Sequence, residues 1–398
     1  MKKNILKFSA IILSLSLLTC ACSFSKSDND ESTENSSDIA SSIEASDSSA
    51  SASDSIVVYD EFIEPNYDEL VTISENSSDD NSTSEDTTIT TDFDIDENCV
   101  MVFFGDSQIA NGKGDGTDIP SLVSKRVPYS TSINLGIGGT TAAVELTTSN
   151  LSDYANWNST CFYGMVLALE GTVDRNSLLA DKPDILENMN KIDPSQVDFY
   201  FIEYGANDFF NKIPLDKYGY EGDIDDLHTY YGALCRGIEK LKEISPQAEI
   251  ILISPFYGIY KDANGTYLGD SYITSNGIGT LADYAKKAKN VTETEEIYYF
   301  DTMFRTYCDL YLDTVDQYLM DNLHLNLLGR QVFSRLLAHI PNWRMGYEPY
   351  AYLETDIIQI ENFNPDEYYR YRDDMLQYYY PEYYEKLMNG EYLLAQPQ

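Results

Sequence analysis

The run Cys99-Val100-Met101-Val102-Phe103-Phe104-Gly105-Asp106-Ser107 decides the fold of this chain. Its first six residues are apolar, which is typical of a strand buried on both faces of a parallel sheet. Gly105 permits a sharp turn, so Ser107 is expected just beyond the end of the strand. Because ligands of open parallel sheets bind outside the carboxyl ends of the strands, this position indicates a functional site.

Further apolar runs predict more strands of the same sheet. They lie around Ile133 and at 197–204, 249–254 and 297–300. Segments with helical periodicity separate them, the clearest at 227–244, 281–289 and 327–339. Strands that alternate with helices predict an α/β domain in which helices cover both sides of a parallel sheet. We place this domain at residues 98–345.

The start of the chain predicts export and a lipid anchor. Met1-Lys2-Lys3 is basic, residues 11–18 are apolar, and Ala21 precedes Cys22. The apolar run is shorter than the roughly 20 residues that a membrane-spanning helix needs. Residues 1–22 resemble a bacterial lipoprotein signal, which implies lipidation of Cys22 at the outer face of the bacterial cytoplasmic membrane. Cys20 fits less well because threonine precedes it, and a plain secretory signal is the alternative.

Residues 23–97 are rich in Ser, Asp, Glu, Asn and Thr and poor in large apolar residues. Such a segment buries too little surface to offset its chain entropy, so we expect a disordered acidic linker. The 398-residue chain has a formal net charge of −40. This charge argues against nucleic acid as a partner, because clustered Lys and Arg bind phosphate backbones.

A serine hydroxyl is a weak nucleophile unless a base and an orienting acid accompany it. The chain has three histidines, His228, His324 and His339. Asp321 precedes His324 by three residues, a spacing that puts both side chains on one side of a helical turn. Asp321 could then hold one ring nitrogen while the other accepts a proton.

Two blocks that follow later strands offer hydrogen-bond donors. Asn134-Leu135-Gly136-Ile137-Gly138-Gly139 offers backbone N–H groups, and Gly205-Ala206-Asn207-Asp208 offers an amide side chain. Donors of this kind stabilise an oxyanion and are each worth roughly a hundred- to thousandfold in rate. The combination predicts a site for acyl transfer.

The motifs G-D-S, N-x-x-x-x-G, G-x-N-D and D-x-x-H occur in this order over about residues 99–340. This order resembles the SGNH hydrolases, also called the GDSL esterase/lipase family. The resemblance implies a flavodoxin-like three-layer α/β/α sandwich, ester hydrolysis, and no metal or cofactor. By motif, it implies a catalytic triad and three oxyanion donors. The triad is Ser107, Asp321 and His324, and the donors are Ser107, Gly139 and Asn207.

Two motif pieces occur twice. Gly269-Asp270-Ser271 repeats the first, but we expect it in a turn-rich loop. Residues 225–228 repeat D-x-x-H at the start of a helix, where the two acids suit the helix dipole, and His228 is an alternative base. We expect His339 to cap the end of the last helix. Asp208 could itself be catalytic, but we expect it to hold the loop that aims Asn207.

Two residues depart from the family pattern and weaken inference about the substrate. Gln108 stands where Leu or Ile is frequent, and Leu325 stands where Pro commonly follows the histidine. Four cysteines beyond the signal, in apolar or aromatic settings, favour buried free thiols, although four could pair in three ways. They are Cys99, Cys161, Cys235 and Cys308.

Residues 346–398 form a Tyr-rich acidic C-terminal extension. Either it packs its rings on the domain as a helical appendage, or it presents a sugar-stacking or lid surface. Together, these features predict an extracytoplasmic serine esterase acting on O-acetyl or other short acyl esters, with acylated polysaccharide as the expected substrate. The alternatives are a non-catalytic glycan-binding surface lipoprotein and an acyltransferase on the same fold.

Overall fold

The computed structural model describes residues 98–148, 150–218, 222–367 and 373–392. The expected signal peptide, Cys22 and the acidic linker lie outside the described residues. In the part that is described, no helix combines the length and the apolarity needed to cross a membrane.

A five-stranded parallel sheet forms the centre of the domain, with the strand order β2-β1-β3-β4-β7. Its strands are β1 (Cys99–Gly105), β2 (Ser130–Asn134), β3 (Phe199–Glu203), β4 (Glu249–Ile253) and β7 (Tyr298–Phe300). Every strand that the apolar runs predict is therefore confirmed. Phe103 of β1 stacks on Phe201 of β3 with ring centroids 4.4 Å apart, and both rings are fully buried.

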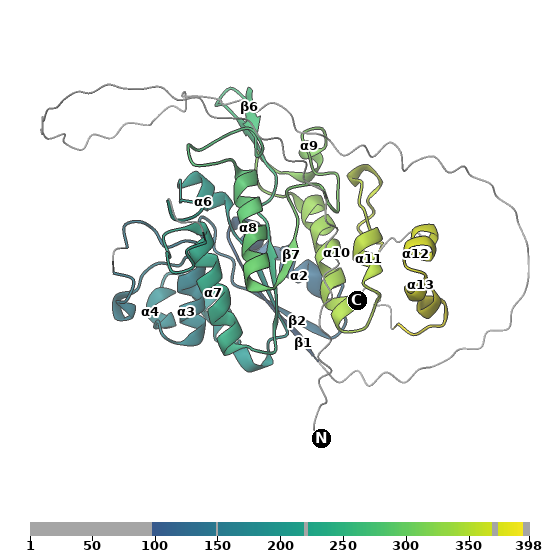
Figure 1. Cartoon of the computed structure of the whole chain (residues 1–398), viewed down its shortest axis with the longest axis horizontal. Coiled ribbons are helices and arrows are strands. Elements are labelled where there is room, and N and C mark those ends of the chain that lie inside the picture. The colour runs from purple at the N-terminus through teal and green to yellow at the C-terminus, as the bar shows by residue number, and fades with distance from the viewer. Residues whose placement is uncertain (1–97, 149, 219–221, 368–372, 393–398) are drawn as a thin grey trace, which may run out of the picture. The chain divides into compact units, whose positions relative to one another are not determined.

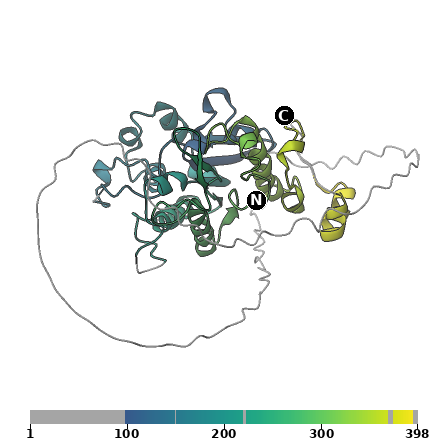
Figure 2. The ribbon, with the colours of Figure 1, turned by 90° about the horizontal axis from the view of Figure 1, so that it is seen from above.

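Helices cover both faces of this sheet (Figure 1). On one side α3 (Phe162–Glu170), α7 (Tyr230–Ile244) and α8 (Leu281–Glu295) pack on one another. On the other, α2 (Ile119–Ser124) packs against α10 (Leu327–Arg344). Figure 2 shows the same domain from above. The expected α/β/α sandwich is therefore confirmed.

Side-chain caps set the starts of the long helices. Thr229 caps α7 by accepting a hydrogen bond from Gly232, so Asp225 and Asp226 precede this helix. The expectation that these acids lie in its first turn is wrong. Thr280 caps α8 in a reciprocal pair with Asp283.

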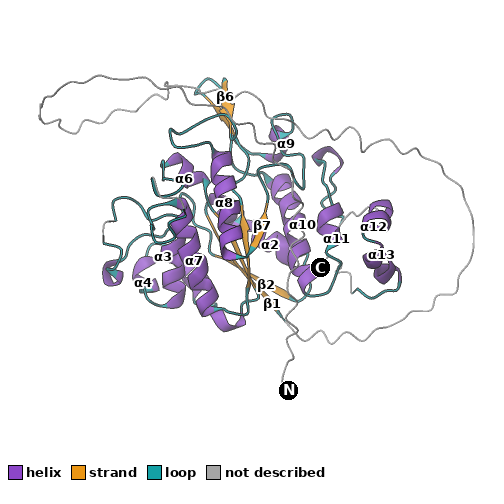
Figure 3. Cartoon of the chain, in the orientation of Figure 1, coloured by secondary structure: helices purple, strands orange, loops and turns teal. Residues whose placement is uncertain are grey.

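Short elements fill the connections between the strands and long helices and make up the C-terminal extension (Figure 3). The short α-helices are α1 (Ser107–Ala110), α4 (Arg175–Leu178), α5 (Pro183–Met189), α6 (Ala206–Phe210), α9 (Val315–Tyr318), α11 (Ala351–Thr355), α12 (Asp373–Tyr379) and α13 (Pro381–Met388). The 3-10 helices are η2 (Lys113–Asp115), η3 (Tyr154–Asn156), η4 (Pro194–Gln196) and η5 (Ile360–Asn362). The strands β5 (Ile259–Lys261) and β6 (Tyr267–Asp270) form an antiparallel hairpin. The second G-D-S tripeptide thus begins within a strand, which corrects the expected loop.

The four cysteines of the described chain are buried and free, which confirms the thiol prediction. Burial raises the pKa of each, to about 12 for Cys161, so these thiols stay protonated at neutral pH.

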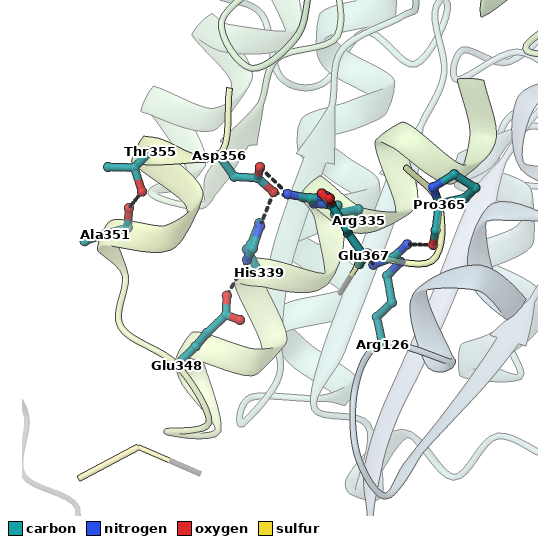
Figure 4. A network of polar contacts seen from close by, with 9 residues as sticks. All are labelled: Arg126, Arg335, His339, Glu348, Ala351, Thr355, Asp356, Pro365 and Glu367. Carbon is teal, nitrogen blue, oxygen red and sulfur yellow. Dashed lines mark hydrogen bonds and ion pairs between the residues drawn. The ribbon is translucent and has the colours of Figure 1, made fainter. Parts of the chain in front are cut away.

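A buried polar network attaches the C-terminal extension to α10 (Figure 4). Arg335 of α10 donates two hydrogen bonds to Asp356, from Nε at 2.7 Å and from Nη2 at 2.6 Å. His339 contacts Asp356 through Nε2 at 3.0 Å and Glu348 through Nδ1 at 2.5 Å. The helix continues to Arg344, so His339 lies in its buried interior and the expected capping role is wrong.

The tyrosines of the extension divide into packed and exposed rings. Tyr380, Tyr383 and Tyr384 pack against a small buried cluster within the extension, formed by Ala351, Tyr352, Leu376 and Leu387. The interpretation that these rings pack on the domain stays a prediction. In contrast, the side chains of Tyr378 and Tyr379 are 78% and 56% exposed. Three further tyrosines, Tyr368, Tyr369 and Tyr371, lie outside the described residues.

Candidate active site

Ser107 begins helix α1 directly after β1, at the carboxyl edge of the sheet. Asp106 caps this helix by accepting a hydrogen bond from the Gln108 N–H at 2.9 Å. A Cβ atom on Gly105 would lie 2.3 Å from Ile109 and 3.0 Å from the Glu203 carbonyl oxygen. The turn that presents Ser107 therefore depends on the missing side chain of Gly105.

The structure brings Ser107, His324 and Asp321 together in a hydrogen-bonded chain. Ser107 Oγ lies 2.9 Å from His324 Nε2, and His324 Nδ1 lies 2.7 Å from Asp321 Oδ2. If Asp321 is ionised, it accepts the Nδ1 proton and leaves Nε2 free to accept the serine proton.

Burial opposes the ionisation of Asp321, but the N–H and ring of His324 and the N–H of Leu323 outweigh it and lower the pKa of this carboxyl. The two N–H groups donate to Asp321 Oδ1 at 2.7 Å each. The carboxylate thus shapes the turn that carries His324 and also orients its ring.

We call residues 319–325 the Asp–His loop. A bridge between Leu319 and Leu325 closes it, and the Met320 N–H donates to the His324 carbonyl oxygen at 2.8 Å. Gln108 is buried beside this loop. Its amide nitrogen donates to the Leu323 carbonyl oxygen at 2.9 Å, and its oxygen accepts from the Leu325 N–H at 3.2 Å. The residue after the nucleophile therefore holds the backbone on both sides of His324.

Sequence reasoning missed this role of Gln108 and treated the residue only as a departure from the family pattern. The available signal was chemical. Unlike the frequent Leu or Ile, a glutamine side chain can both donate and accept hydrogen bonds.

Asn207 follows β3 in helix α6, and its side-chain nitrogen donates to Asp106 Oδ2 at 2.9 Å. An amide nitrogen carries two hydrogens, so one remains for a ligand. The positive φ of +137° at Gly205 makes the turn that aims Asn207.

The loop with Gly139 lies against the nucleophile. A Cβ built on Gly138 would be 3.7 Å from Ser107 Cβ, and Gly139 has a φ of +82°. Among the described residues, no backbone carbonyl accepts from the N–H groups of Ser107 or Gly139. All three expected oxyanion donors therefore retain an N–H that can bind a ligand.

Asp208 is buried, and its carboxylate accepts from the Ala142 N–H at 2.9 Å and the Ala143 N–H at 3.1 Å. It thus ties helix α6, which carries Asn207, to the chain that follows Gly139. Burial is the main cause that raises the pKa of Asp208 to about 7, and the charge of Asp106 adds to it, while the two N–H groups oppose the rise.

Two fully buried carboxyl groups, Asp106 and Glu203, lie at the ends of the paired strands β1 and β3. Burial is the main cause that raises the pKa of both, and the charge of Asp106 raises that of Glu203 further. Within the described chain neither side-chain oxygen of Glu203 has a hydrogen-bond partner, so burial favours its protonated, uncharged form.

The second copies of the two motifs make hydrogen bonds away from the triad. His228 Nδ1 lies 3.1 Å from the Val144 carbonyl oxygen. Ser271 Oγ donates to the Gly258 carbonyl oxygen at 3.1 Å and accepts from its N–H at 2.9 Å. These contacts give both residues structural roles.

The sequence matches the model of the GDSL-like Lipase/Acylhydrolase family over residues 103–332. The chain belongs to this family and is a hydrolase that acts on ester bonds. No curated protein matches the chain.

Solved structures of several other proteins are similar to this chain. A Lactobacillus plantarum protein is 20% identical with a TM-score of 0.44, over 61% of this chain and 96% of its own. A structure described as a possible lipase from Chitinophaga pinensis is 18% identical with a TM-score of 0.41, over 62% and 98%. An acetyl xylan esterase is 16% identical with a TM-score of 0.36, over 62% and 98%.

Proposed function

We propose that this protein is an extracytoplasmic serine esterase with the triad Ser107, His324 and Asp321. The observation that supports the triad most is the pair of contacts at the imidazole, 2.9 Å to Ser107 and 2.7 Å to Asp321. One ring nitrogen faces the nucleophile and the other faces an acid, which is the arrangement that general-base activation of a serine needs.

In the proposed reaction, His324 Nε2 removes the hydroxyl proton of Ser107 while Oγ attacks the carbonyl carbon of the ester. The N–H groups of Ser107 and Gly139 and the amide of Asn207 stabilise the resulting oxyanion. The imidazolium then protonates the departing alcohol oxygen as its bond to carbon breaks. Water attacks the acyl-serine by the same steps, and the acid and free Ser107 are released.

We propose short acyl esters, O-acetyl groups foremost, carried by a polysaccharide. Two observations support a bulky alcohol. The side chains of His324 and Asp321 are 28% and 52% exposed, so the base lies where a large substrate can reach it. The ring of Phe210, three residues after Asn207, is 48% exposed and offers an apolar face for a sugar ring. The proposed lipid anchor at Cys22 would keep the enzyme at the cell surface.

Hydrolysis of a short aryl ester tests the nucleophile and the base. The wild-type chain should turn over p-nitrophenyl acetate, and Ser107→Ala and His324→Ala should abolish this turnover, whereas His228→Ala should leave it unchanged. Equal rates for wild type and Ser107→Ala would exclude the proposed nucleophile. If His228→Ala loses activity and His324→Ala keeps it, the catalytic base is His228.

Two further measurements test the substrate and the location. Acetylated glycans should be deacetylated faster than longer-chain esters are hydrolysed, and a preference for long acyl chains contradicts the substrate class. Cys22→Ser should release the protein from the membrane fraction. If this variant stays membrane-bound, Cys22 is not the anchor.

A further inference from the structure

The C-terminal extension pairs with the connection between β7 and α9. The Ile358 N–H donates to the Tyr307 carbonyl oxygen at 2.9 Å, and the Asp309 N–H donates to the Ile358 carbonyl oxygen at 3.1 Å. These bonds form a short parallel bridge between Cys308 and Ile358, and both side chains are buried. The extension therefore continues the packed domain at this point.

The Asp309 carboxyl joins the extension to helix α9. Its Oδ1 accepts from the Ile360 N–H at 3.1 Å and from the Tyr318 hydroxyl at 2.6 Å. Tyr318 is fully buried, and burial above all raises the pKa of its phenol, so the hydroxyl stays a donor. Because a buried hydroxyl without an acceptor destabilises the fold, Asp309 fixes where Tyr318 lies.

Tyr318 stands at the base of the Asp–His loop. Its carbonyl oxygen accepts from the Asn326 N–H at 2.8 Å, next to the Leu319–Leu325 bridge that closes the loop. A Cβ built on Gly329 would lie 2.5 Å from the same oxygen, so the first turn of α10 leaves little room for Tyr318 to shift. A displacement of Tyr318 would pass to the loop through these bonds.

The extension is itself held firmly where it meets Asp309. Asp356, two residues before Ile358, is buried and bonded to Arg335 and His339 of α10 (Figure 4). Further along, Arg126 donates to the carbonyl oxygens of Pro365 at 3.0 Å and Glu367 at 3.1 Å. Residues 358–360 are thus fixed from both sides against the folded domain.

We propose that the extension is part of the catalytic apparatus: through Ile360, Asp309 and Tyr318 it sets the position of the Asp–His loop, and hence the reach of His324 to Ser107. Asp309 and Tyr318 are positioning residues and do not touch the ester. The proposal rests on the proposed triad. We call this series of contacts, from residues 356–360 through Asp309 to Tyr318, the brace. It begins outside residues 103–332, which are the residues that the family model matches.

Two substitutions cut the brace at different bonds. Tyr318→Phe keeps the buried ring and removes only the hydroxyl, and Asp309→Ala removes the acceptor of both hydrogen bonds. Because a misplacement of about 1 Å can cost on the order of a hundredfold, we expect kcat for p-nitrophenyl acetate to fall roughly tenfold in each. KM should change by less than about twofold, since no contact with the substrate is lost.

A reactive phosphonate that labels Ser107 should be used to count active sites, because a variant that is only less stable keeps its kcat per labelled site. The matched control is Asp313→Asn, an exposed acid in the same connection, which should match wild type. On the extension side, Ile360→Pro removes the N–H donor at the first position of η5, where proline suits the backbone. It should lower kcat as Tyr318→Phe does.

Amide hydrogen exchange gives a readout that does not need activity. The amides of Met320 and Asn326 should exchange faster in Tyr318→Phe than in wild type, with those of β1 and β3 unchanged. Wild-type kcat per site and wild-type exchange in all three variants would overturn the brace and leave the proposed function standing. If the wild-type chain fails to hydrolyse any ester, the proposed function fails, and the exchange of Asn326 decides the brace alone.

Discussion

The Asp106 carboxylate accepts a hydrogen bond from the Asn207 side-chain amide at 2.9 Å, and so fixes which end of that amide faces the nucleophile. Asp106 Oδ1 is already bonded to the Gln108 N–H. Only Oδ2 therefore remains for Asn207, and an ionised Asp106 leaves the second amide hydrogen of Asn207 for the oxyanion.

This relationship predicts the effect of Asp106→Asn, a substitution that preserves shape. The new amide keeps its oxygen on the Gln108 N–H and turns its nitrogen toward the nitrogen of Asn207. Two donors cannot bond, so Asn207 should flip and present its oxygen to the oxyanion. We expect kcat for an aryl ester to fall roughly a hundred- to thousandfold, as for loss of an oxyanion donor.

A double-mutant cycle separates this effect from simple damage. Asn207→Ala alone should cost about as much as Asp106→Asn, and the double variant should cost little more than either, because both remove one interaction. Additive losses would show that Asp106 acts independently of Asn207. Asp181→Asn, at an exposed carboxylate, serves as the control.

Sequence patterns predict the strands β1 and β3 and the functional residues that follow them, because local features of the sequence define the strands and their ends. A continuous apolar run identifies a buried strand, and a glycine followed by a polar residue marks its end. In a parallel sheet those ends meet at one edge, so residues far apart in the sequence could be placed together. This is why Ser107, Asn207 and Gly139 could be assigned to one site.

Tertiary partners without a local pattern could not be predicted. The Gln108 side chain hydrogen-bonds to Leu323 and Leu325, which lie 215 and 217 positions later in the sequence. Because it bonds to their backbone groups, the side chains at these positions give no sign of the contact. His339 was misassigned for a related reason. Its partners Glu348 and Asp356 lie in the extension, where no periodicity shows which acid faces the helix.

Gln108→Met should slow catalysis without unfolding the chain. Methionine fills nearly the same volume but can hold neither the Leu323 carbonyl nor the Leu325 N–H, so the backbone around His324 is released. We expect kcat per active site to fall roughly ten- to hundredfold with KM little changed. Gln317→Met, at an exposed glutamine of α9, is the matched control. A wild-type kcat in Gln108→Met would leave Gln108 with a packing role alone.

Asp321→Asn should impair the triad while it keeps the loop. The oxygen of the new amide can still accept from the N–H groups of Leu323 and His324, but its nitrogen would face His324 Nδ1. This contact favours the tautomer with the proton on Nε2, which cannot accept the serine proton. The loss of kcat should remain below the roughly 10⁴-fold known for a buried triad aspartate, since the Asp321 side chain is 52% exposed.

The repeated motif provides the control for this substitution. Asp225→Asn should leave the hydrolysis of an aryl ester at the wild-type rate. If Asp321→Asn also hydrolyses the aryl ester at the wild-type rate, another group orients His324, and Asp321 has no part in the triad.

His339→Gln should change how stability depends on pH. Burial disfavours the charge of His339, but Glu348 and Asp356 outweigh it and raise its pKa from 6.5 to about 9. Because the folded pKa is the higher one, the protonated pair stabilises the fold fully below pH 6.5, and this contribution is lost as pH rises through about 9. The contribution is on the order of 3 kcal/mol.

Urea unfolding should therefore show a large deficit in the free energy of unfolding of His339→Gln, relative to wild type, at about pH 6, and this deficit should shrink above about pH 9. A deficit in His339→Gln that stays constant with pH would mean that His339 is neutral in the folded protein.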